Sequence, residues 1–316
     1  MNKLKINVQG ERWFPSETQF SEEMGKNWGN WYCDSEVGKL RDVLLRRPGK
    51  EIEIINEGNY SDYRWKAPMD IEKARMQQDK LAEIYKANGV RVHYVEEQRE
   101  DRPNALYLRD LVFMTPEGAI VCRPGISARR GEERFAAQAL SKLGVPIVRT
   151  INGGGIFDGA CAMWVDRQTV ILGTGARANA EGAEQVEYEL RKMGVTNILR
   201  MGIPYGHAHL DGIMNFVDKK TMILFPWQVS YDVVKPLLDK GVKVIEITDI
   251  EEIKSNLSIN SVAIEPGKII MPAGCPNTKK KIEDAGVEVI EIDLSEILKG
   301  WGSVHCMSAF LNRDPV

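Results

Sequence analysis

The sequence Ser141-Lys-Leu-Gly-Val-Pro-Ile-Val-Arg-Thr150 contains the junction that decides the fold: the end of a helical pattern, then Gly144-Val145, then a β-branched run. The glycine suits the left-handed residue that ends a helix, and the β-branched residues suit a buried strand. Four similar junctions occur in KANGVRVHYV, RKMGVTNILR, LDKGVKVIEI and EDAGVEVIEI, with glycines at positions 89, 194, 241 and 286. Five copies at intervals of about fifty residues predict a repeated unit of strands around one helix, as in propellers, solenoids or arrays.

A doubly wound α/β fold also contains helix-to-strand junctions of this kind. That fold predicts a glycine-rich phosphate loop after the first strand. The sequence LLRRPGKEIE (residues 44–53), which follows the first expected strand, does not supply one. The repeat is therefore the preferred interpretation, with a strand from Leu40 that stops at Pro48 and a helix over residues 69–88.

Composition excludes several classes of partner. The chain has 316 residues and a formal net charge of -3, which provides no field for nucleic acid or an anionic membrane. Its start, MNKLKINVQGERWFPSE, lacks a continuous apolar region, and no stretch reaches the roughly 20 apolar residues of a membrane span. Five cysteines without a Cys-x-x-Cys pair suggest free thiols rather than disulfides or a zinc site. We expect a cytoplasmic protein with no nucleic-acid or membrane partner.

Residues 1–38 differ from the rest because aromatic residues occur there among polar ones without clear periodicity. Trp13, Phe14, Trp28, Trp31 and Tyr32 are the aromatic residues concerned. We expect an N-terminal extension over residues 1–38 that lies across the main body or a partner subunit, and a single catalytic domain over residues 39–316. The aromatic extension could also provide a subunit contact in a homo-oligomer.

Polar residues gather at the ends of the repeated units. The segment NALYLRD (residues 104–110) leaves Asp110 at the mouth of an apolar strand, and NGGGIFDGAC (residues 152–161) carries Asp158 in a glycine-rich turn. In GARAN (residues 175–179), Asn179 is an expected helix N-cap and Arg177 lies near the positive end of that helix, where an arginine suits a carboxylate ligand. For each charge alone, a solvated loop residue is the simpler interpretation.

The segment HAHLD (residues 207–211) has two interpretations. His-x-His-x-Asp resembles part of a metallohydrolase site, but the chain has only four histidines, which argues against a metal. The alternative is that one histidine acts as general acid and base with a carboxylate nearby, while the other is a core residue. We predict no metal site.

The segment GWGSVHCMS (residues 300–308) presents Cys306 behind two glycines that permit close backbone approach to a bound molecule. If Asp110, Asp158 and His209 converge on it, the two carboxylates would bind a planar guanidinium through parallel hydrogen bonds. Cys306 would then attack the guanidinium carbon while His209 protonates the departing amine.

This order of motifs resembles the guanidino-modifying superfamily, which includes arginine deiminases, dimethylarginine dimethylaminohydrolases and amidinotransferases. The resemblance covers residues 40–313 and rests on the Arg-Asp of residues 109–110, the acidic glycine turn, His-Leu-Asp and Gly-x-x-x-His-Cys-Met. It implies a five-bladed pseudo-symmetric α/β propeller, the pentein fold, around a central active site.

The resemblance also implies roles for single residues. Cys306 is the expected nucleophile, His209 the general acid and base with Asp211 beside it, and Asp110 a guanidinium ligand. Deiminases show Glu-Gly-Gly-Asp in the acidic turn, whereas this chain has Asn152-Gly-Gly-Gly. We therefore assign the third catalytic position to Asp158, by similarity to the Phe-Asp-Ala-Ala-Asp turn of glycine amidinotransferases, with Asn152 as the alternative.

Residues 177–184 resemble the dimethylarginine hydrolases, in which the matching arginine helps to hold a substrate carboxylate. Arg123, Arg129, Arg130 and Arg313 are further arginines that could do so, and Asp211, Arg177 and Arg123 are our remaining substrate-binding candidates. The predicted function is a cysteine hydrolase of an arginine-like guanidino compound, with a covalent S-amidino intermediate and no cofactor. The alternatives are an amidinotransferase with an amine acceptor and a non-catalytic binding protein of the same fold.

Overall fold

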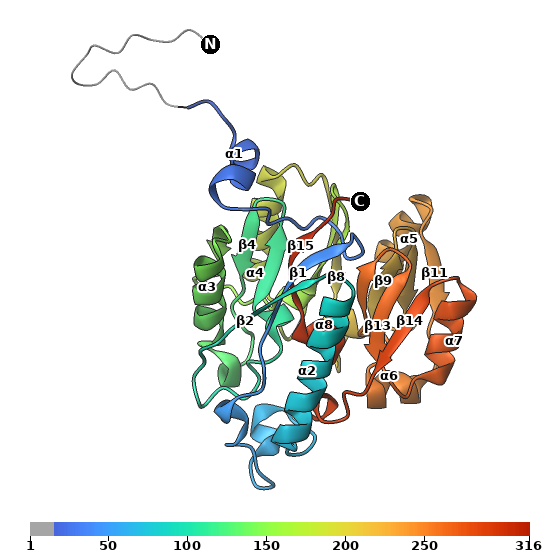
Figure 1. Ribbon diagram of the computed structural model, residues 1–316. Helices are drawn as coiled ribbons and strands as arrows, with labels where there is room; N and C mark the ends of the chain where they lie inside the picture. The colour runs from blue at the N-terminus through green and yellow to red at the C-terminus, as the bar shows by residue number, and fades with distance from the viewer. Residues whose placement is uncertain (1–15) are drawn as a thin grey trace, which may run out of the picture.

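The strands form five three-stranded sheets in the computed structural model, which describes residues 16–316 (Figure 1). In chain order the sheets contain β1 (Leu40–Leu45), β2 (Arg91–Tyr94) and β15 (Ala309–Arg313); β3 (Val112–Thr115), β4 (Gly118–Val121) and β5 (Ile147–Thr150); β6 (Ala162–Asp166), β7 (Thr169–Thr174) and β8 (Asn197–Gly202); β9 (Met214–Asp218), β10 (Thr221–Leu224) and β11 (Lys243–Glu246); and β12 (Val262–Glu265), β13 (Lys268–Pro272) and β14 (Glu288–Ile292).

Each sheet repeats one connection. An antiparallel hairpin such as β3–β4 leads into a helix, which returns the chain to a third strand parallel to the hairpin's second strand. The helices of the five units are α2 (Ile71–Ala87), α3 (Glu132–Leu143), α4 (Ala180–Lys192), α5 (Tyr231–Asp239) and α7 (Pro276–Asp284). Outside the repeat lie α1 (Phe20–Asn27), α6 (Ile250–Asn256) and α8 (Val304–Met307).

The five glycines of the repeated junction end the five unit helices as predicted. Their φ angles, 77° at Gly89, 76° at Gly144, 86° at Gly194, 78° at Gly241 and 87° at Gly286, lie in the left-handed region. A side chain with Cβ is strained there, and glycine is not. The predicted five-bladed α/β propeller is confirmed by the five equivalent sheets.

The two chain ends complete the first sheet. β15 pairs with β1 in antiparallel register, with Val43 opposite Phe310, so the last strand of the chain takes the place that a hairpin partner has in the other sheets (Figure 1). The ring of sheets is therefore closed by residues more than 250 positions apart. This closure also fixes α8, which directly precedes β15.

Burial differs between the strands of one sheet. The hairpin strands β3 and β4 are buried along their whole length, whereas the third strands, such as β5, are half exposed. Each fully buried valine, leucine or isoleucine contributes about 1.5–3 kcal/mol to folding. The hairpins therefore form the core, and the segments that enter them are held near the centre.

Part of the expected N-terminal extension belongs to this core. Trp31, Cys33 and Val37 are buried within the main apolar cluster, and Cys33 N donates to Thr115 O at 3.3 Å. Trp28 is about half exposed, and Trp13 and Phe14 lie outside the described residues. The stretch 31–37 therefore packs across the main body, as the sequence suggested for part of residues 1–38.

The cysteines and the helix lengths bear on two further predictions. All five cysteines are free and buried, as predicted for thiols. Within residues 16–316 there is no helix with both the length and the apolar character needed to cross a bilayer.

Asp42 on β1 gives a prediction about stability. Its buried carboxylate accepts hydrogen bonds from Arg91 at 2.7 Å, His93 at 2.9 Å and Asn312 at 3.0 Å. Burial alone would raise the pKa of Asp42, but these hydrogen bonds outweigh it and hold the pKa well below its usual range. The carboxylate therefore stabilises the fold above its unfolded pKa of about 4, and this contribution is lost as the pH falls further toward the folded value.

We expect Asp42→Ala to lower the free energy of unfolding by about 2 kcal/mol at pH 7, with a smaller difference from wild type at pH 3. Urea unfolding at both pH values measures this. Asp79→Ala is the control, because Asp79 forms a half-exposed ion pair with Arg47 and its loss should cost less than about 1 kcal/mol. An equal loss at pH 3 and pH 7 would contradict the assigned role of the carboxylate.

Candidate active site

Four of the predicted site residues come from short segments that lead into a strand of a sheet. Asp110 ends η3 (Leu108–Asp110) before β3, and Asp158 precedes η5 (Gly159–Cys161) before β6. His209 precedes η6 (Leu210–Gly212) before β9, and Cys306 lies in α8 before β15. Segment η3 packs against both η5 and α8, and η5 packs against η6. The repeat thus brings four distant segments to one centre.

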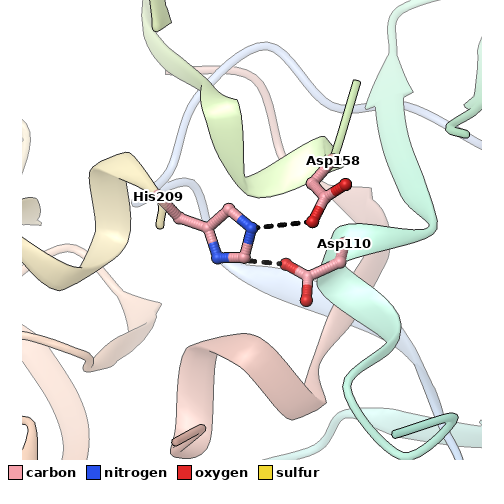
Figure 2. Close-up of side chains that lie close together, drawn as sticks. All are labelled: Asp110, Asp158 and His209. Atoms are coloured by element: carbon pink, nitrogen blue, oxygen red, sulfur yellow. Dashed lines mark hydrogen bonds and ion pairs between the residues drawn. The ribbon is translucent and has the colours of Figure 1, made fainter. Parts of the chain in front are cut away.

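His209 lies between two carboxylates (Figure 2). Its Nε2 is 2.9 Å from Asp158 Oδ2, and its Nδ1 is 3.5 Å from Asp110 Oδ1. Both acids are buried and point toward the imidazole rather than into solvent. Burial alone would lower the pKa of His209, but the charges of Asp110 and Asp158 outweigh it, and the pKa is raised. The imidazole is therefore suited to hold and donate a proton.

An arginine forms an ion pair with each of the two carboxylates, Asp110 and Asp158. Arg129, which is buried, forms an ion pair with Asp110 Oδ2 and donates to Glu132 Oε2 at 2.8 Å. Arg177 Nη1 lies 3.3 Å from Asp158 Oδ2. The other oxygen of Asp110, Oδ1, is buried without a hydrogen-bond partner in the structure and faces His209. Asp110 therefore keeps one acceptor free for a ligand.

Cys306 contacts a different pair of polar groups. Its Sγ is 3.2 Å from Nδ2 of Asn260 and 3.6 Å from Oδ2 of Asp211, two residues after His209. The backbone N–H of His305 also donates to Asn260 Oδ1, at 2.9 Å. Burial raises the pKa of the Cys306 thiol well above its usual range, and the charges of Asp211 and Asp110 raise it further. A cation bound beside the sulfur would counter these effects and favour the thiolate.

The other predicted site residues lie farther out. Asn152 is exposed at the end of β5, where its Nδ2 donates to Thr150 O and its N–H to Gln185 Oε1. Arg123 donates to the carbonyl of Gly155 at 2.8 Å, so it ties down the glycine-rich turn. Asn179 caps α4 as predicted, by accepting from Gly182 N at 2.8 Å. Of the two candidates for the third catalytic position, Asp158 is the one that contacts His209.

His207 is partly exposed and packs edge-on against Phe225, with ring centroids 6.3 Å apart. Among the described residues, one group has the spacing that a metal ion would need: Asp110, Asp158 and His209, whose ligand atoms lie within 4.8 Å of one another. Arg129 and Arg177 already pair with these acids, which disfavours a second cation between them. The absence of a metal stays a prediction.

Sequence reasoning missed Asn260, which lies two residues before β12. Four of the five sheets contribute a predicted site residue from the segment that leads into them, and the fifth sheet contributes Asn260 from the corresponding position. The repeat itself was the signal that could have revealed it. Glu36 was not identified as a neighbour of the site either, because no local pattern connects it to the site. Arg129 was considered only as a possible ligand for a substrate carboxylate and not as the partner of Asp110.

We expect Asn260→Asp to lower activity by about tenfold or more while the protein stays folded. Aspartate keeps the acceptor for the His305 N–H but replaces the N–H that faces Cys306 Sγ with a carboxylate oxygen, which opposes the thiolate. Steady-state kinetics and thermal unfolding of the same preparation measure both effects.

The control is Asn215→Ala. Asn215 is equally buried and donates to Ser261 O at 2.6 Å, and none of its hydrogen bonds goes to Cys306. That variant should lose stability by about 1–3 kcal/mol yet keep its turnover per folded molecule. Full activity of Asn260→Asp would show that the amide is structural only.

Most of the chain matches a known protein family. The model of the family described as N,N dimethylarginine dimethylhydrolase, eukaryotic, matches residues 53–313. The chain belongs to this family. Its membership of the guanidino-modifying superfamily, predicted from the motifs, is thereby confirmed.

Two curated relatives of this dimethylarginine dimethylhydrolase family member carry different names. The N(G),N(G)-dimethylarginine dimethylaminohydrolase of Pseudomonas aeruginosa is 32% identical over 208 residues, which covers 65% of this chain and 76% of the relative. The 2-nitroimidazole nitrohydrolase of a Mycobacterium species is 26% identical over 316 residues, which covers 91% of this chain and 83% of the relative.

Solved structures agree with the fold. A mutant dimethylarginine dimethylaminohydrolase from P. aeruginosa, in complex with citrulline, has a TM-score of 0.71 at 25% identity and covers 86% of this chain and all of the other. An amidinotransferase from Microseira wollei has a TM-score of 0.73 at 14% identity, with 90% and 98% of the chains covered, and shows the fold alone. The relatives support a guanidino hydrolase of the dimethylargininase or deiminase type.

Proposed function

We propose that this protein hydrolyses a C–N bond of a guanidino compound related to arginine, with Cys306 as the nucleophile. The observation that carries the proposal is the convergence of His209, Asp110 and Asp158 beside the segment that bears Cys306 (Figure 2). The free oxygen of the Asp110 carboxylate can accept from a planar cation, and the buried thiol of Cys306 supplies a nucleophile. The family relationship supports the same substrate class.

The substrate guanidinium would lie between Asp110 and Asp211. The free Oδ1 of Asp110 accepts a hydrogen bond from one N–H group of the guanidinium. The positive charge of the guanidinium favours ionisation of the Cys306 thiol, which burial and the charges of Asp211 and Asp110 otherwise oppose. The hydrogen bond to Asp110 and the stabilisation of the thiolate both require a bound cation. The thiolate therefore forms where its electrophile is already in place.

The reaction then follows in balanced steps. Cys306 Sγ bonds to the guanidinium carbon, and the C–N bond to the leaving amine breaks as His209 transfers a proton to that nitrogen. The amine departs and leaves an S-amidino adduct. Neutral His209 next accepts a proton from water, whose oxygen bonds to the same carbon. The C–S bond then breaks as the hydroxyl proton of this adduct passes to solvent, so that a neutral ureido product leaves, the thiolate is restored and His209 is again protonated.

Asp158 has a positioning role in this scheme. Its Oδ2 accepts from His209, and its Oδ1 accepts from Gly125 N at 2.8 Å, so the carboxylate is held on both sides. It orients the imidazole and stabilises its charged form. Cys306 and His209 account for every bond change, so the proposed reaction uses neither metal nor organic cofactor.

Arg177 is our candidate for the substrate carboxylate. It lies beside Asp158 with part of its side chain exposed, whereas Arg129 is fully engaged by two acids and Arg123 holds the glycine turn. A substrate with an amino-acid carboxylate would place that group at the open side of the site. Agmatine, which lacks the carboxylate, should therefore show a lower kcat/KM than arginine.

A substrate screen tests the proposal. The purified chain is incubated with dimethylarginine, monomethylarginine, arginine, agmatine, guanidinoacetate and guanidinobutyrate, and with 2-nitroimidazole because of one relative's name. Ureido product, released amine or nitrite, and an amidino adduct on Cys306 are measured. A new guanidino product that forms only with an added amine would identify the alternative, an amidinotransferase. Absence of both turnover and adduct with every guanidino compound would refute the proposal.

A further inference from the structure

A second histidine, His305, directly precedes the nucleophile Cys306 in the sequence. His305 is almost completely buried, and both of its ring nitrogens face carboxylates. Its Nδ1 is 2.8 Å from Asp211 Oδ2, and its Nε2 is 3.4 Å from Glu36 Oε2. Glu36 comes from the N-terminal stretch that packs across the core, so residues about 270 positions apart meet behind Cys306.

Glu36 is held in place by other groups. Its Oε1 accepts from Arg109 Nη2 at 3.3 Å and from the backbone N–H of Trp164 at 3.1 Å. Arg109 is the neighbour of Asp110, so this cluster is attached to the catalytic segments on two sides. An ionised carboxylate only accepts hydrogen bonds. Two such acceptors facing one imidazole require a proton on each ring nitrogen, which is the imidazolium form.

The charged groups around His305 act in both directions: the two carboxylates favour the imidazolium form, and the nearby guanidinium of Arg109 opposes it. Asp211 faces it from η6, Glu36 from the N-terminal stretch and Arg109 from η3, while Arg313 on β15 lies beyond the ring of Phe310. Burial alone would lower the pKa of His305, but its hydrogen bonds to Asp211 and Glu36 outweigh this, and the pKa is raised. Burial would raise the pKa of Glu36, but the charge of Arg109 and the hydrogen bond to His305 outweigh it and lower that pKa to about 2.

We propose that His305 is a permanently charged positioning residue, held by Glu36 and Asp211, that favours the thiolate form of Cys306. The proposal rests on the proposed function, in which Cys306 is the nucleophile. His305 does not touch the substrate in this scheme and acts through Asp211. The two histidines then have different roles: His209 transfers protons, and His305 carries a constant positive charge.

The charge of His305 acts on Cys306 through one oxygen atom of Asp211. Oδ2 of Asp211 is shared by His305 Nδ1 at 2.8 Å and by Cys306 Sγ at 3.6 Å. A hydrogen bond from an imidazolium withdraws charge from this oxygen, so it accepts the thiol proton less strongly and repels a thiolate less. Neutral His305 with its proton on Nδ1 would still donate to Asp211, but without the positive charge it would withdraw less charge from Oδ2, which would then favour the protonated thiol more.

Glu36→Gln tests the charge with little change of shape. The glutamine carbonyl can still accept from Arg109 and Trp164, while its amide N–H would face Nε2 and permit a neutral ring. We expect the pKa of the Cys306 thiol to rise. Alkylation of this thiol by iodoacetamide, at a fixed pH below that pKa, should slow by about tenfold if the pKa rises by about 1. Mass spectrometry assigns the alkylated cysteine across a pH series.

Two further variants complete the experiment. His305→Asn keeps a donor toward Asp211 but removes the charge, so it should slow alkylation in the same direction. Glu189→Gln is the matched control: Glu189 is also buried and accepts from Arg149 at 2.8 Å, but it lies on α4. That control should leave the alkylation profile unchanged. A merely structural role of His305 would lower stability without moving the profile.

The wild-type protein gives an independent measurement if either variant fails to fold. In protein labelled with ¹⁵N histidine, His305 should show two protonated ring nitrogens at pH 8, whereas a neutral ring shows one. A neutral His305, or an unchanged alkylation profile in folded Glu36→Gln and His305→Asn, would overturn the inference. Neither readout needs turnover, so this failure is distinct from an absence of guanidino hydrolysis.

Discussion

Cys306→Ala is expected to abolish turnover of the guanidino substrate, by about 10⁴-fold or more. In the proposed mechanism the thiol forms the bond to the guanidinium carbon, and alanine offers no nucleophile in its place. The side chain is small and lies in a short helix held by the Asn260 contacts to the backbone, so the fold should persist. Steady-state kinetics, together with mass spectrometry for the amidino adduct, measures the loss.

Cys161→Ala is the matched control for this experiment. Cys161 is also buried near the site, with its Sγ 3.9 Å from Ala208 O, and burial raises its pKa well above the usual range. It forms no hydrogen bond with Asn260 or Asp211 in the described residues and has no role in the proposed mechanism. Its replacement should change activity little. Retained activity in Cys306→Ala, or a comparable loss in Cys161→Ala, would remove the assigned nucleophile.

His209→Gln is expected to lower kcat by about 10³-fold, because glutamine can occupy the space but cannot transfer a proton. His209 is the group between Asp110 and Asp158 that can protonate the departing amine. Its raised pKa, caused mainly by the charges of Asp110 and Asp158, lets the imidazole keep its proton to higher pH than a free imidazole, and activity should fall as the pH rises through that pKa. The pH profile of kcat in wild type shows this limb directly.

Asp158→Asn tests the effect of this carboxylate on catalysis, and His93→Gln is the control for a substitution beside a buried carboxylate elsewhere. Asparagine removes one charge that raises the pKa of His209, so kcat should fall by about 10²-fold and the high-pH limb should move to lower pH. His93 also contacts a buried carboxylate, Asp42, but within the first sheet, and its replacement should leave the pH profile unchanged. If Asn152→Ala proved more damaging than Asp158→Asn, the assignment of the acidic turn would be wrong.

Much of the fold followed from local sequence. A glycine that must be left-handed and a β-branched strand after it are properties of a few adjacent residues, and the five repeats of this pattern gave the five sheets. The order of short motifs led to Cys306, His209, Asp110 and Asp158. Family membership confirms the superfamily to which those motifs pointed. The roles of the single residues await the experiments above.

Tertiary structure decided which charges face each other. Glu36 reaches His305 across most of the chain, Arg129 pairs with Asp110, and Asn260 reaches Cys306 Sγ. Periodic patterns in the sequence do not predict these contacts. Hydrogen bonds and ion pairs depend on distances and directions within a few ångströms, and the folded structure sets those distances and directions when the sheets close into a ring. The sequence by itself therefore determined the repeat and the reactive groups, whereas the closed ring decided their partners and the charges that set their protonation.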